Sequence, residues 1–214
     1  MNIQTNIEHE EFQTGCVTIV SSAHAVHDTY TAFLPALLPV LIEKFSLTNT
    51  LAGLLSVFLT IPSLLQPFIG HLADRANLRL LIILTPAITG AAMSLLSIAP
   101  RYGYLIFLLV LAGLSSASLH AIGPVLSGTF AGKKLGRGMS FWMVGGELGR
   151  ALGPLVVVTA IGYLTLEGIP WLMIAGVFTS IFLYGKLKSI TTQPRNNGNH
   201  IPWKTGLKMM RKVM

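Results

Sequence analysis

Residues 102–127 read YGYLIFLLVLAGLSSASLHAIGPVLS, a stretch that contains no Lys, Arg, Asp or Glu. Coiled as an α-helix at about 1.5 Å per residue, it is long enough to cross the ~30 Å hydrocarbon core of a bilayer. Five further apolar stretches of a similar kind lie near 15–42, 51–73, 79–99, 138–162 and 168–187. The sequence therefore predicts an all-α membrane protein with six transmembrane helices.

Charge is scarce and unevenly placed. Charged residues make up 11% of the chain and hydrophobic ones 52%, whereas soluble domains carry about 25% charged residues. The loops and tail on one side hold twelve of the fifteen bases: Arg75, Arg79, Lys133, Lys134, Arg137, Lys186, Lys188, Arg195, Lys204, Lys208, Arg211 and Lys212. The opposite side holds only Lys44 and Arg101. The positive-inside rule then predicts a multi-pass protein with both termini in the cytoplasm.

Three regions follow from this pattern: a cytoplasmic tail over 1–14, a six-helix bundle over 15–187, and a basic cytoplasmic linker over 188–214 that could begin a seventh helix. The net charge of +7 is explained by topology and by contact with anionic lipid headgroups, so no nucleic-acid partner is expected. Cys16 is the only cysteine, which excludes an intramolecular disulfide and an all-cysteine metal site. No cofactor or metal is expected.

Five ionisable residues are predicted to lie at membrane depth. His24, His27 and Asp28 share one helix face because they are spaced i, i+3 and i+4. Glu147 and Arg150 lie in the fifth stretch. Such groups cost roughly 2.5–3.5 kcal/mol each on insertion scales, so they should face a cavity and one another. Proton coupling by His24, His27, Asp28 and Glu147 is the favoured interpretation, since histidine titrates near physiological pH. Alternatively, Glu147 and Arg150 only neutralise each other.

Arg150, His120 and Trp142 are the candidate solute-binding residues, although His120 could equally be a packing residue. A competing interpretation is an intramembrane metal or hydrolytic enzyme that uses the His, Asp and Glu side chains. The lack of a tight His-x-x-x-His or Glu-x-x-His set counts against metal, and Ser115-Ser116 lacks the flanking glycines of an activated serine. A third possibility is a six-helix fragment that does not transport.

The turn after the second stretch reads Gly70-His71-Leu72-Ala73-Asp74-Arg75-Ala76-Asn77-Leu78-Arg79. On its own it could be a tight turn with flanking bases. It resembles the signature loop of the major facilitator superfamily, which implies a gating loop at the membrane surface. Residues that match are Gly70, Leu72, Asp74, Arg75 and Arg79, whereas Asn77 and Leu78 depart from the pattern. Asp74 would receive Arg75, Arg79 or Arg137 and act as a latch between transport states.

The fifth stretch carries Gly145, Gly149 and Gly153, followed by Pro154. Glycines four apart form a smooth groove on one helix face, and the proline bends the helix. The groove could be a generic packing seam, yet the whole string resembles the antiporter motif of drug exporters in the same superfamily. We expected this groove, like Gly70, to need partner helices from outside the chain.

A closer resemblance, to the fosmidomycin-resistance branch, covers about residues 20–160. It rests on Ser22-Ala23-His24-Ala25-Val26-His27-Asp28, Phe45-Ser46-Leu47-Thr48, Leu65-Gln66-Pro67 and Gly136-Arg137-Gly138 leading to Val144-Gly145-Gly146. The resemblance implies drug export by proton exchange across a bacterial inner membrane. It also implies about twelve spans, so the chain would be an N-terminal half of two three-helix repeats, completed by a second half or a second copy. His120 falls on a His-Pro-Glu pattern of that branch, but Ala121 and Ile122 replace its last two residues.

Overall fold

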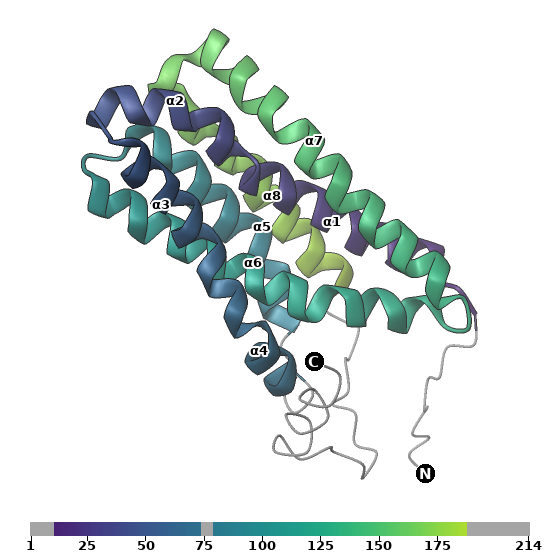
Figure 1. Ribbon diagram of the computed structural model, residues 1–214. Helices are drawn as coiled ribbons and strands as arrows, with labels where there is room; N and C mark the ends of the chain where they lie inside the picture. Colours follow the sequence, from purple (N-terminus) through teal and green to yellow (C-terminus); the bar gives the residue numbers. More distant parts are fainter. Residues whose placement is uncertain (1–10, 74–78, 188–214) are drawn as a thin grey trace.

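The computed structural model describes residues 11–73 and 79–187, and all regular structure within them is helical (Figure 1). The α-helices are α1 (Thr14–Thr31), α2 (Phe33–Phe45), α3 (Asn49–Thr60), α4 (Gln66–Ala73), α5 (Arg79–Ser94), α6 (Tyr102–Ala131), α7 (Leu135–Gly168) and α8 (Met173–Leu187). Short 3-10 segments are η1 (Ile61–Leu65), η2 (Leu95–Ile98) and η3 (Ile169–Leu172). The all-α prediction is confirmed.

Within the described residues, five helical runs are long and apolar enough to cross a membrane: Thr14–Phe45, Asn49–Ala73, Leu80–Ile98, Tyr102–Ala131 and Leu135–Leu187. The last run has 53 residues, or about 80 Å of helix, which is more than twice the thickness of a hydrocarbon core. It is interrupted at Thr165, whose φ of 58° and ψ of −177° are not helical. After this break α8 runs back beside α5 (Figure 1). The fifth run thus contains both of the last two predicted apolar stretches.

Local sequence explains where the first helices end. Ser46 closes α2 in the left-handed conformation with φ 48°, and the Thr48 hydroxyl caps α3 by accepting the Leu51 N–H at 3.3 Å. Threonine is a favourable N-cap residue because its hydroxyl satisfies a backbone N–H that has no partner within the helix. Pro62 lies in the first turn of η1, where its missing N–H and fixed φ favour the tighter 3-10 segment between α3 and α4.

The α1 and α7 helices pack against each other along their length (Figure 1). A methyl group on any of three α7 glycines would collide with a backbone carbonyl of α1. The pairs are Gly145 with Ser21, Gly149 with Ala25, and Gly153 with Thr29. The groove therefore finds its partner helix inside the chain, and our expectation of an outside partner for it is wrong. At Gly70, a methyl group would meet no described atom within 4 Å.

Gly149→Ala should lower the free energy of unfolding by about 1–3 kcal/mol, as overpacking usually does. The added methyl group can be accommodated only if α1 and α7 separate. Gly162→Ala is the matched control, because it lies on the same helix with open space around it; it should be neutral or stabilising by up to ~1 kcal/mol. Thermal unfolding in detergent micelles checks both variants. Equal melting temperatures would contradict the close helix contact.

Along α1, a polar segment is held between two apolar clusters. Val17 and Val20 belong to one cluster, and Tyr30 and Phe33 to the other. The Tyr30 hydroxyl anchors α1 to the beginning of α8, since it donates to the Leu172 carbonyl at 2.5 Å and accepts from the N–H at position 176 at 2.9 Å. The residues between Val20 and Tyr30 are thereby held at a fixed depth in the bundle, and these residues carry the ionisable groups.

Candidate functional site

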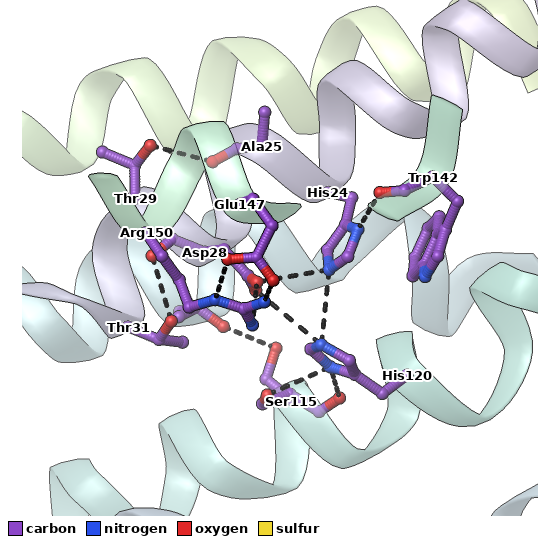
Figure 2. A network of polar contacts seen from close by, with 12 residues as sticks. His24, Ala25, Asp28, Thr29, Thr31, Ser115, His120, Trp142, Glu147 and Arg150 are labelled. Carbon is purple, nitrogen blue, oxygen red and sulfur yellow. Dashed lines mark hydrogen bonds and ion pairs between the residues drawn. The ribbon is translucent and has the colours of Figure 1, made fainter. Parts of the chain in front are cut away.

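Five ionisable side chains from three helices meet beside the groove (Figure 2). We call this set the polar cluster: His24 and Asp28 on α1, His120 on α6, and Glu147 and Arg150 on α7. The sequence placed the α1 and α7 members at similar depth but did not show that His120 joins them. The structure therefore unites residues assigned to proton coupling with residues assigned to solute binding.

The two histidines have fixed orientations. His24 Nδ1 lies 2.9 Å from the Trp142 carbonyl, and His120 Nδ1 lies 2.9 Å from the Ser116 carbonyl. A carbonyl oxygen can only accept, so each Nδ1 must carry a proton and donate it. The two Nε2 atoms then face each other at 3.3 Å. Trp142 further restrains His24, because the two rings stack with centroids 3.8 Å apart and planes 15° apart.

Asp28 lies at the centre of the polar cluster. Its side chain is only 2% exposed, and its Oδ2 lies 3.3 Å from His24 Nε2. The Arg150 guanidinium donates to the same oxygen from Nη1 at 3.2 Å. His120 Nε2 is 3.9 Å from the other carboxylate oxygen. A carboxylate at this depth needs such partners, since an unpaired buried charge is costly.

Arg150 and Glu147 form the outer edge of the polar cluster. Arg150 donates from Nε to Glu147 Oε2 at 3.3 Å and from Nη2 to Oε1. Arg150 is 49% exposed and Glu147 is 63% exposed. Glu147 and Arg150 therefore partly neutralise each other, which was one interpretation of the sequence. Arg150 also contacts Asp28 on the neighbouring helix. The guanidinium links a buried carboxylate with one that faces outward.

Two glycines that the sequence did not single out as site residues make room for this arrangement. A methyl group on Gly146 would lie 2.8 Å from His24 Nε2 and 3.1 Å from the Asp28 carboxylate. On α6, a methyl group at Gly123 would overlap the Trp142 ring. The sequence clue was the doubled glycine at 145–146, of which the first meets the α1 backbone and the second meets its side chains.

His27 is buried completely on α1 but stays apart from the polar cluster. Neither of its ring nitrogens has a hydrogen-bond partner among the described residues. Its ring centroid lies 6.0 Å from that of His120, without a hydrogen bond between them. A role of His27 in proton coupling remains a prediction that these contacts do not support.

The predicted gating loop falls largely outside the described residues. Gly70 lies in α4, whereas Asp74 and Arg75 are outside them, and so is the side chain of Arg79 at the start of α5. The Arg137 guanidinium lies over the Phe12 ring, 4.5 Å from its centroid, a distance typical of a cation–π contact. The latch at Asp74 therefore stays a prediction.

His24, Asp28 and His120 also have the ligand types of a metal site. One ligand atom from each lies within 4.8 Å of the others. The positive Arg150 guanidinium, however, lies 3.2 Å from the Asp28 carboxylate. It already compensates the carboxylate and would repel a divalent cation. A metal ion at these three residues would have to compete with the Arg150 guanidinium for the Asp28 carboxylate.

Comparisons with known proteins agree on one family. The family model described as Major Facilitator Superfamily matches residues 20–213. The fosmidomycin resistance protein of Escherichia coli is 26% identical over 184 residues, which cover 86% of this chain and 45% of that protein. The uncharacterized MFS-type transporter YfnC of Bacillus subtilis is 29% identical over 168 residues, covering 77% of this chain and 41% of that protein.

A third match is the multidrug transporter DTR1 of Candida glabrata, 32% identical over 122 residues, or 54% of this chain and 22% of that protein. The chain thus spans less than half the length of the curated relatives that it matches.

Proposed function

Because this chain belongs to the major facilitator superfamily, a family of membrane transporters, we propose that it is the N-terminal half of a proton-coupled exporter of small solutes. A second six-helix half or a second copy of the chain would complete the pathway, and a bacterial inner membrane is its proposed location. The polar cluster is the observation that carries this proposal. Ionisable residues inside spanning helices are costly, so they mark the path of an ion or a solute.

In the proposed cycle, Asp28 and Glu147 both compete with the solute for the Arg150 guanidinium. With Asp28 ionised, its carboxylate competes for the guanidinium, which lies 3.2 Å away. A proton arriving at Asp28 or His24 weakens that attraction and frees Arg150 for a solute. Glu147 also holds the guanidinium and is the more exposed carboxylate, so an anionic solute would displace it first. Proton binding and solute binding would then be coupled through one side chain.

The solute would be a small, drug-like molecule held near Arg150, His120 and Trp142. The class of solutes would include anions. His120 is 30% exposed, whereas Trp142 presents its ring to His24. The resistance and multidrug names of two relatives support a drug-like solute. They also make fosmidomycin a reasonable first compound to test.

Transport in everted membrane vesicles tests this function. Vesicles from cells that express the complete protein should accumulate the exported solute when acidified inside, and an uncoupler should abolish the accumulation. A panel that contains fosmidomycin, neutral drugs and cationic drugs would define the solute class. Residues 1–214 alone should give no flux unless they pair with a second copy. Absence of flux for every compound with the complete protein would contradict the proposed export.

The proposed orientation can be checked with impermeant thiol reagents on intact cells. Single cysteines at Asn49 and Gly168, introduced after Cys16→Ser, should be labelled from outside. Cysteines at Asn77, Lys134 and Asn197 should be labelled only after the cells are opened, because the basic loops are proposed to face the cytoplasm. Labelling at Lys134 in intact cells would reverse the orientation.

A further inference from the structure

We propose that His24, His120 and Asp28 together hold one exchangeable proton, shared between the two Nε2 atoms and the carboxylate. This inference deepens the proposed function, on which it rests, by naming the atoms of the proton site. It moves His120 from the solute-binding residues to the proton-binding ones. The hydrogen-bond pattern and the charge of the polar cluster support it independently.

The hydrogen-bond pattern requires a proton at the centre. Both Nδ1 atoms already donate to backbone carbonyls, those of Trp142 and Ser116. Each neutral imidazole therefore offers only a lone pair at Nε2. These two lone pairs face each other at 3.3 Å, and the Asp28 carboxylate lies 3.3 Å from one of them. Arg150 donates to the Asp28 carboxylate from the other side, but no donor lies between the three acceptors, and one added proton gives them a shared hydrogen bond.

The net charge of the polar cluster also indicates one added proton. Asp28 and Glu147 contribute two negative charges, and Arg150 contributes one positive charge. The polar cluster with neutral histidines therefore carries a net charge of −1, and one proton makes it neutral. Neutrality is the favoured state for a group of charges at membrane depth.

Among the residues that the structure describes, neighbouring helices add no competing charge at this point. On α1 itself, His27 is the nearest further titratable group, and its ring centroid lies 6.0 Å from that of His120. Beyond Arg79, the sequence of α5 contains no titratable residue. Those of α8, Tyr184 and Lys186, are in its last turn and are exposed. The shared proton thus depends on the polar cluster alone.

Loss of the proton has a mechanical consequence. The two Nε2 atoms belong to different helices, His24 to α1 and His120 to α6. Once the proton leaves, their lone pairs oppose each other at hydrogen-bond distance, and the rings should move apart. Proton occupancy would then control how closely α6 approaches α1 beside the solute site.

Trp142 supplies a built-in probe of this proton. It stacks on His24, so an imidazolium there should quench its fluorescence. In a background where Trp142 is the only tryptophan, which within this chain requires Trp171→Phe and Trp203→Phe, the full protein without solute or gradient should show one fluorescence transition with the slope of a single proton. In His120→Gln, the Gln amide can donate to His24 Nε2, so the transition should move to lower pH by about one unit or more.

Matched variants make the result decisive. Asp28→Asn should also move the transition to lower pH, since its amide can donate to His24 in place of the proton. His71→Gln, on α4 outside the polar cluster, should leave the transition unchanged. An unchanged midpoint in His120→Gln would overturn the proposal and assign the proton to His24 alone, and a two-proton slope in the parent would overturn it as well. The measurement needs no transport, so its failure is distinguishable from failure of the proposed function.

Discussion

Asp28→Asn will abolish solute accumulation driven by a proton gradient while it preserves solute binding. Asn has nearly the shape of Asp, but Arg150 and His24 both contact Asp28 Oδ2, so the amide can either accept from Arg150 or donate to His24. It cannot take up or release a proton near neutral pH. Accumulation in everted vesicles should therefore fall to the level of vesicles without the protein. The dissociation constant of a solute should change by less than about tenfold, or ~1.4 kcal/mol.

Passive exchange of labelled solute is the informative control for Asp28→Asn. If the variant folds and retains the pathway, exchange across vesicles without a gradient should persist. Uphill accumulation with an unchanged pH profile would move the proton carrier elsewhere. Glu147, the other carboxylate of the polar cluster, would be the next candidate, and Glu147→Gln would test it directly.

Arg150→Ala should weaken the binding of anionic solutes by about 10- to 100-fold and leave neutral ones nearly unaffected. This range corresponds to the loss of one charge-assisted hydrogen bond, ~1.5–3 kcal/mol. The variant should also be less stable, because Asp28 is 2% exposed and loses its guanidinium partner. The cost should lie between the ~1 kcal/mol of an exposed ion pair and the 3–5 kcal/mol of a buried one.

Two further variants separate charge from geometry at this position. Arg150→Lys keeps the positive charge but loses the planar fork, so it should recover stability better than it recovers anion binding. Glu147→Gln removes the carboxylate that competes for Arg150 and should tighten anion binding. Equal losses for neutral and anionic solutes in Arg150→Ala would contradict a direct contact between Arg150 and the solute.

The helices could be predicted from sequence because bilayer thickness imposes a length on every span. Four of the six apolar stretches agree with single helical runs to within a few residues, and the last two fall within one run, Leu135–Leu187. The Glu147–Arg150 contact follows from their spacing on one helix. The meeting of His24 with His120 could not be predicted, since it depends on how three separate helices pack. The role of Gly146 could not be predicted either, because the space that a glycine leaves matters only once the residue opposite it is known. For His27, helical spacing predicted the face that it shares with His24 and Asp28 but could not show that its ring nitrogens lack hydrogen-bond partners among the described residues.

The match between the α7 glycines and the α1 carbonyls restricts the register of the two helices, and the register decides which charged residues beside it can meet. The glycines of α7 and the matching carbonyls of α1 both recur every four residues. A shift of α1 along α7 by four residues, about 6 Å, would therefore place α1 carbonyls against α7 glycines again. Such a slip would move Asp28 by the same distance and break its contact with Arg150, while the His24 Nδ1–H would lose the Trp142 carbonyl. The three glycine–carbonyl contacts alone thus allow more than one register, and the space for His24 at Gly146 together with the charges selects one of them. Substitutions that remove these charges should therefore allow α1 and α7 to adopt a second register. Cross-linking between cysteines on α1 and α7 would detect it as new cysteine pairs one helical turn apart.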